Sequence, residues 1–213
     1  MFKLPTALSK RRFVFAAACL TLSCGTDLIR SARAEPDGQQ PGAAPESKTA
    51  QALAYLKKGL EHFIMGRMAD ARNDLQAAAR INPNIKNVQF LQVYVDFGLQ
   101  DFRACVRDTS CWLDGSTWQL HEAPYVVMLG VLARKSLGDE NAAQKLLSEG
   151  LSQCSRAWPY PLLSYMNGGI DLEALRESAA TNPQQTDFKF YTALFKSASH
   201  PASAAVAPKL DLQ

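Results

Sequence analysis

The sequence predicts an all-α protein built of consecutive helix-turn-helix units. Between residues 49 and 196, apolar residues recur three and four positions apart, which is the spacing of one face of an α-helix. Clusters of glycine or proline fall between these periodic runs, where they are expected to form turns. The segment has about 150 residues, which is enough for one domain with a hydrophobic core.

The first unit shows the pattern most clearly. One apolar run reaches Phe63, a turn follows at Gly66, and a second run ends before Pro83. Gly59 and Ala71 are small residues in the two runs, and we expect them to let the two helices approach closely. This period of about 34 residues resembles the tetratricopeptide repeat (TPR).

Two further units follow with less regular patterns. The second extends over residues 85–111 and the third over residues 124–154, where Gly138 and Asp139 are expected to end one helix and cap the next. The sequence therefore predicts a TPR-like solenoid of about three repeats plus a partial fourth.

The C-terminal part carries two motifs that resemble a known family. A corner, Trp158-Pro159-Tyr160-Pro161, precedes a short apolar stretch, and Asp187-Phe188-Lys189-Phe190-Tyr191 reads as the first helix of another repeat. Over residues 52–195 this order resembles the new lipoprotein I family of bacterial envelope TPR proteins. The resemblance implies an adaptor, usually dimeric, that brings envelope proteases or peptidoglycan-remodelling enzymes to their targets. The final helix, 187–196, lacks the second helix of its repeat, so we expect it either to cap the domain or to pair with a second molecule.

Residues 1–34 are predicted to be a cleaved signal peptide. Basic residues precede an apolar run over 13–24, and Ala32-Arg33-Ala34 supplies a small-residue cleavage site. The apolar run is about twelve residues long, whereas a membrane-spanning helix needs roughly twenty. The pair Arg11-Arg12 is compatible with a twin-arginine signal, and general secretion is the other route. The prediction is therefore a periplasmic or otherwise exported protein; lipidation at Cys24, which would anchor it in the envelope, is the alternative.

Segments rich in proline, glycine or small residues flank the repeat domain. Residues 35–48 are predicted to be a flexible linker and residues 197–213 a disordered tail. The chain has 23 basic and 20 acidic residues, of which residues 1–34 contain six and one, so 17 and 19 remain. This near-neutral balance gives no indication of a nucleic-acid partner.

The cysteines leave two interpretations open. Cys19 and Cys24 lie in the signal, and three cysteines remain in a compartment that permits disulfides. On one helix, Cys105 and Cys111 would point apart, which makes Cys111 with Cys154 the better pair. The alternative is that all three are buried thiols that pack as small apolar residues.

The sequence offers no complete catalytic or metal-binding motif. His62, His121 and His200 are scattered, and no Cys-x-x-Cys occurs. The pair His121-Glu122 resembles the start of a zinc-protease motif, but the second histidine four residues after the first is missing. We therefore predict a protein that is not an enzyme and uses no cofactor or metal.

A binding role has a mechanism in such a fold, because stacked helix pairs present a concave surface lined by the first helix of each pair. The partners would be other envelope proteins, and a homodimer is also compatible with the pattern. In our register the groove residues are Leu56, Leu60, Phe63, Gln89, Val93, Asp96, Val127, Val131 and Arg134. Ordinary core packing is the alternative for each aliphatic residue in this set. The alternative function is a self-associating structural component of a secretion or envelope assembly.

Overall fold

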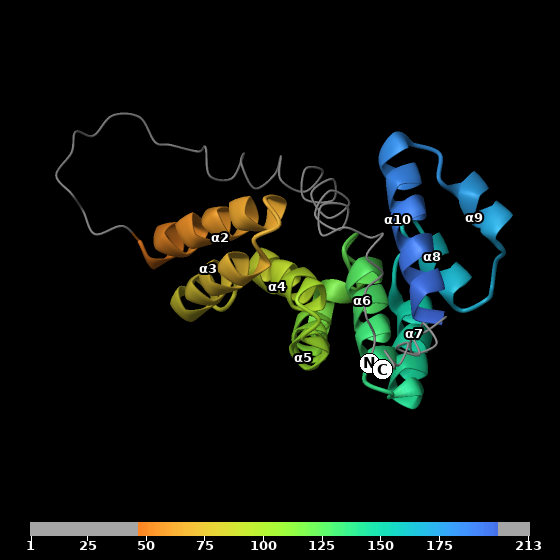
Figure 1. The fold of residues 1–213 in the computed structure, drawn as a ribbon, viewed down its shortest axis with the longest axis horizontal. Coiled ribbons are helices and arrows are strands. Elements are labelled where there is room, and N and C mark those ends of the chain that lie inside the picture. Colours follow the sequence, from red (N-terminus) through yellow and green to blue (C-terminus); the bar gives the residue numbers. More distant parts are fainter. Residues whose placement is uncertain (1–46, 200–213) are drawn as a thin grey trace, which may run out of the picture.

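The computed structural model describes residues 47–199, which are almost entirely helical (Figure 1). In chain order the elements are α2 (Lys48–Ile64), α3 (Met68–Ile81), α4 (Lys86–Gly98), α5 (Phe102–Trp112), a 3-10 helix (Gly115–Gln119), α6 (Ala123–Ser136), α7 (Glu140–Gln153), α8 (Tyr160–Met166), α9 (Leu172–Ser178) and α10 (Asn182–Ser199). Within 47–199 there is no β-strand, which confirms the all-α prediction. The predicted signal peptide, Cys24, and most of the predicted linker and tail lie outside the described residues.

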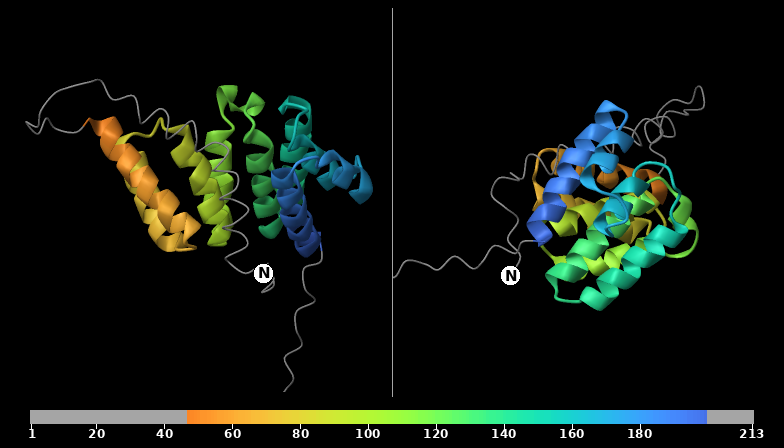
Figure 2. Two further views of the ribbon diagram at one scale, coloured as in Figure 1. Left: turned by 90° about the horizontal axis from the view of Figure 1, so that it is seen from above. Right: turned by 90° about the vertical axis from the view of Figure 1, so that its right-hand side faces the viewer.

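The helices form hairpins that are stacked in chain order. The two helices of α2/α3, of α4/α5 and of α6/α7 pack on each other more extensively than on any other helix. Contacts of α3 with α4 and of α5 with α6 then join each hairpin to the next. Figure 2 shows the resulting row of helices, with α8, α9 and α10 at its C-terminal end.

The three hairpin turns share one backbone feature, a residue with a positive φ angle. Each contains a residue in the left-handed region, namely Gly66 (φ 73°), Gln100 (φ 61°) and Gly138 (φ 80°). In the second and third hairpins, Asp101 and Asp139 follow and accept a hydrogen bond from the amide three residues further on. Left-handed residues end the first helix, and aspartate caps begin the second, so local sequence sets the length of the helices.

Small residues allow the helices to approach closely, as the sequence predicts. A Cβ added to Gly59 would lie 3.0 Å from the Leu75 side chain, and Ala71 is fully buried in the same contact. Between hairpins, a Cβ on Gly130 of α6 would lie only 2.5 Å from Thr109 Cγ2 of α5. The absence of a side chain at Gly130 therefore fixes how closely the second and third hairpins pack.

The C-terminal helix differs from its sequence prediction in length and in surroundings. It begins at Asn182 rather than at Asp187 and continues to Ser199, and it packs against α6, α8 and α9 of its own chain. Within this single chain the helix therefore packs as a cap, and pairing with a second molecule stays a prediction. At the other end, Lys48 belongs to α2 rather than to the linker, because Ser47 accepts a hydrogen bond from the Ala50 amide and caps the helix.

Candidate functional site

The most distinctive feature of the molecule is the surface on which α10 lies. Four aromatic residues contact α10 and come from α4, α6, the segment before α8, and α8 itself; we call them the α10-binding face: Tyr94, Tyr125, Trp158 and Tyr165. The buried side chains of α10 that lie toward this face recur at helical spacing: Asp187, Phe190, Tyr191, Leu194 and Phe195. The chain's own last described helix thus covers the surface formed by α4, α6 and α8.

A buried carboxyl group anchors the first half of α10. Asp187 Oδ2 accepts hydrogen bonds from the Tyr125 hydroxyl, 2.6 Å away, and from the Trp158 indole Nε1, 3.1 Å away. Burial raises the pKa of Asp187, while the two hydrogen bonds and the nearby His121 act against that rise. The pKa of the Tyr125 hydroxyl is raised by burial and by the Asp187 charge, so this hydroxyl remains a hydrogen-bond donor.

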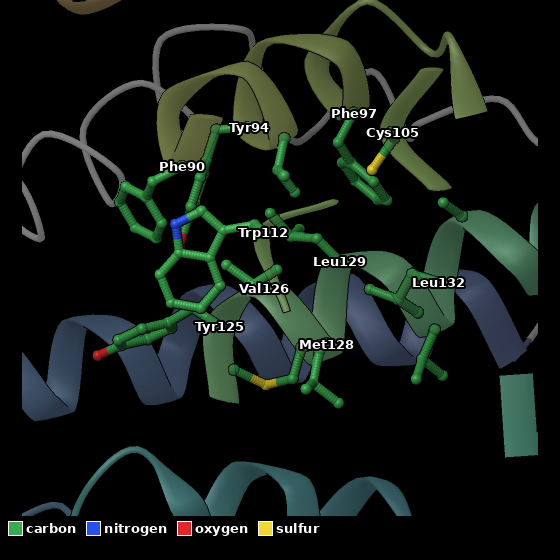
Figure 3. Close-up of a cluster of buried hydrophobic side chains, with 14 of the residues drawn as sticks. Phe90, Tyr94, Phe97, Cys105, Trp112, Tyr125, Val126, Met128, Leu129 and Leu132 are labelled. Atoms are coloured by element: carbon green, nitrogen blue, oxygen red, sulfur yellow. The ribbon is translucent and has the colours of Figure 1, made fainter. Parts of the chain in front are cut away.

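Aromatic contacts hold the next two turns of α10. The hydroxyl groups of Tyr94 and Tyr191 lie 3.0 Å apart, and both residues are buried. The ring of Tyr191 also lies 5.6 Å from that of Tyr125, and Phe195 stacks on Tyr165 at 6.3 Å. Figure 3 shows Tyr94 and Tyr125 within the buried aromatic layer between α4 and α6. The polar groups at this surface are therefore embedded in an apolar environment, where hydrogen bonds are strong.

A second polar cluster joins the first two hairpins. Arg72 of α3 forms ion pairs with Asp96, at 2.9 Å, and with Asp101. Asp96 is 3% exposed, and its burial, together with a hydrogen bond to Asp108, raises its pKa to about 7. Arg72 acts in the opposite direction on Asp96, but desolvation outweighs it. For the half-buried Asp101 the balance is the reverse, since the hydrogen bond from Arg72 lowers its pKa.

An open hollow of the surface adjoins this cluster. It is lined by Ala69, Arg72, Asn73, Leu99, Gln100 and Asp101. The charged groups at its wall, Arg72 and Asp101, are bound to each other. We therefore assign the cluster to the junction between the hairpins rather than to a ligand.

Most of the predicted groove residues are core residues, and for them the groove prediction is wrong. Those that are 5% exposed or less are Leu56, Phe63, Val93, Asp96, Val127 and Val131. The remaining three, Leu60, Gln89 and Arg134, are half-buried. The physical reason is visible in α6, where eleven consecutive residues from Ala123 to Ala133 are buried. Neighbouring hairpins and α10 surround this helix, so its outward-facing positions do not line an open groove.

The predicted disulfide is absent from the structure, and the described cysteines are free thiols. Cys111 is exposed in the last turn of α5, whereas Cys154 is buried after α7. Burial raises the pKa of Cys154 to about 11 and also raises that of Cys105. The alternative of buried thiols is thus correct for two of the three residues.

Residues 47–199 contain neither a cluster of candidate metal ligands nor a candidate membrane span. No group of three histidine, cysteine, aspartate or glutamate side chains in this range is placed to hold a metal ion. The same range contains no helix with the length and apolar character needed to cross a membrane.

The sequence pattern does not predict the α10-binding face, although it contains two parts of this contact. Trp158 belongs to the corner motif and Tyr191 to the Phe-x-Phe-Tyr segment, but nothing in the local pattern shows that they meet. The one residue that points to this contact is Asp187, because it lies on the apolar stripe of α10, four residues before Tyr191. A carboxylate at such a position requires hydrogen-bond donors from another element.

Comparisons of the chain with models of protein families, with curated proteins and with solved structures found no match. The resemblance to the new lipoprotein I family accordingly rests on the residues given under Sequence analysis.

Proposed function

We propose that the protein is a non-enzymatic TPR-like scaffold of the bacterial envelope that binds another protein on the side formed by the first helices of its hairpins, part of which α10 covers over α4 and α6. The observation that carries this proposal is the position of α10, which lies on α4, α6 and α8 and makes side-chain contacts with each. A surface that accepts one amphipathic helix has the shape and the apolar character to accept another.

The sequence supports the proposed location and the proposed class of partner. The predicted signal at residues 1–34 favours export, and the order of motifs over residues 52–195 resembles envelope adaptors that act on proteases or peptidoglycan-remodelling enzymes. Stacked hairpins support such a role because each unit adds area to one continuous surface.

Site-specific photo-crosslinking in living cells tests the scaffold. A crosslinking residue at Ile64, which is 47% exposed at the end of α2, is compared with one at the exposed Lys145 of α7. Ile64 belongs to a first helix and Lys145 to a second helix, so a defined partner should be captured at Ile64 only. Equal capture at both positions, or none at Ile64, would contradict the proposal, and an adduct of the chain with itself would favour the self-associating alternative.

Mass spectrometry of the protein from the cell envelope tests the location. We expect an N-terminus after Ala34. An acylated Cys24 would instead establish the lipid-anchored alternative, and an intact N-terminus in the cytoplasm would contradict export.

A further inference from the structure

The two donors that bind Asp187 belong to the scaffold and not to α10. Tyr125 is 1% exposed on α6, and Trp158 lies in the corner before α8, so both are positioned by packing that does not depend on α10 alone. Both donate to the same oxygen atom of the carboxyl group. If α10 left this surface, two donors would point at one place with no acceptor between them, and a carboxylate is the group that satisfies them best.

Polar groups around Asp187 also favour an acidic occupant. The imidazole of His121 lies 5.8 Å from the Tyr125 ring and acts to lower the pKa of Asp187. The donors Tyr125 and Trp158 also favour the ionised form of Asp187. The site thus offers a carboxyl group two hydrogen-bond donors, which act against the rise in pKa caused by burial.

The rest of the contact sets the spacing of the occupant. Asp187, Tyr191 and Phe195 follow one another at intervals of four residues, and they contact Tyr125, Tyr94 and Tyr165 respectively. Positions separated by four residues lie on one face of a helix. The surface therefore selects a helix with a carboxylate followed by an aromatic residue one turn later and another two turns later.

The helix α10 is also less firmly packed than the helices of the hairpins. α10 packs less extensively on α6, α8 and α9 than the two helices of any hairpin pack on each other. Helices held by a few side-chain anchors undock at lower free energy than the core does.

We propose that the α10-binding face is an exchangeable recognition site for an acidic, aromatic helix of a partner protein, and that α10 occupies it until that helix displaces it. This inference rests on the proposed scaffold function and names the chemistry of its partner. The recognition element is the carboxylate site made by Tyr125 and Trp158.

The test uses a labelled peptide with the sequence of residues 182–199 as a stand-in for the partner helix. Its binding to the full chain is measured by fluorescence anisotropy, with wild-type protein and with the Tyr191→Ala variant, whose own α10 loses a buried anchor. The peptide should bind the variant at least about tenfold more tightly, because the occupied fraction of the site falls. Asp187→Asn in the chain is a second, milder variant. Circular dichroism verifies that both variants retain their helices. Of the three proteins, the wild type should bind the peptide most weakly.

Two peptide variants test the carboxylate site itself. Asp187→Asn in the peptide should weaken binding about tenfold or more, because a hydrogen-bonded charge is lost, whereas Lys189→Asn, at an exposed position, should have no effect. When Tyr125→Phe is added to the Tyr191→Ala chain, the difference in affinity between the unchanged peptide and its Asp187→Asn variant should shrink.

Three outcomes would overturn the inference: no peptide binding to either chain variant, equal binding of the unchanged and Asp187→Asn peptides, or light scattering that shows a dimer in which α10 is exchanged between copies. The last outcome would make a second copy the occupant. If crosslinking at Ile64 still captures a partner while the peptide fails, the scaffold function stands and only this recognition site is wrong.

Discussion

Replacing Asp96 with asparagine should remove part of the pH dependence of the stability of this protein. Asp96 is buried at the junction of the first two hairpins and has a pKa of about 7 instead of 3.8. The charged groups that face it are Arg72 of α3 and, in the second hairpin, Asp101 and Asp108. Because the folded-state pKa lies above the unfolded value, the folded state binds this proton more tightly. The free energy of unfolding contributed by Asp96 is therefore highest at low pH and falls as the pH rises from about 4 through 7.

The magnitude follows from the two pKa values. One pKa unit corresponds to about 1.4 kcal/mol, and for values of 3.8 and about 7 the change between pH 5 and pH 8 is about 2 to 3 kcal/mol. The Asp96→Asn variant lacks this titration. The free energy of unfolding of the variant, relative to wild type, should thus increase by about 2 to 3 kcal/mol over the same range.

Urea unfolding followed by circular dichroism at pH 5, 6, 7 and 8 measures this difference, and urea leaves the ionic strength constant. Asp101→Asn is the matched control, because Asp101 binds the same arginine but has a lowered pKa and stays ionised throughout the range. Asp101 is the smallest of the causes that shift the pKa of Asp96, so the control should differ from wild type by a nearly constant amount. A difference between Asp96→Asn and wild type that changes by less than about 0.5 kcal/mol from pH 5 to 8 would refute the reasoning.

Three further predictions concern packing, thiol reactivity and the tyrosine pair. Gly130→Ala should lower the free energy of unfolding by about 1 to 3 kcal/mol, since its Cβ would meet Thr109 Cγ2 at 2.5 Å, and Thr109→Ala in the same chain should restore much of the loss in thermal unfolding. Cys111 should react quickly with Ellman's reagent in the folded protein and the two buried cysteines only after unfolding; fast reaction of more than one described thiol would contradict the structure. Tyr94→Phe and Tyr191→Phe should be non-additive, with a coupling of about 1 kcal/mol in a double-mutant cycle, whereas additive losses would show that their hydroxyl groups do not interact.

Local sequence predicts the hairpins well because their determinants are local. Gly66 and Gly138 mark turns through their left-handed backbone, and Asp139 caps the helix that follows. Small residues such as Gly59 show where two helices meet, since a larger side chain there would clash. These features lie within a few residues of the structure they cause, so the periodic pattern and the turn residues together indicate each hairpin.

The groove prediction is wrong where a helix is apolar around its whole circumference and not along one stripe. The segment from Ala123 to Ala133 is apolar on every side, and such a helix is surrounded by protein rather than lining an open surface. Reading it as a helix with one core face and one ligand face assigned Val127 and Val131 to the groove, although both are fully buried. The uniform apolar character of this segment already predicted that another element covers it.

The identity of that covering element depends on contacts between residues that are 62 and 97 positions apart, Tyr125 with Asp187 and Tyr94 with Tyr191. Periodicity gives the face of each helix but not which faces meet, and hydrophobic burial alone would allow α10 to slide or to dock elsewhere. The buried carboxyl group restricts these alternatives, because any other register would leave Asp187 without donors at a cost of several kcal/mol. A polar contact of this kind contributes little net stability but selects one arrangement, and for the same reason it selects among the helices that could replace α10.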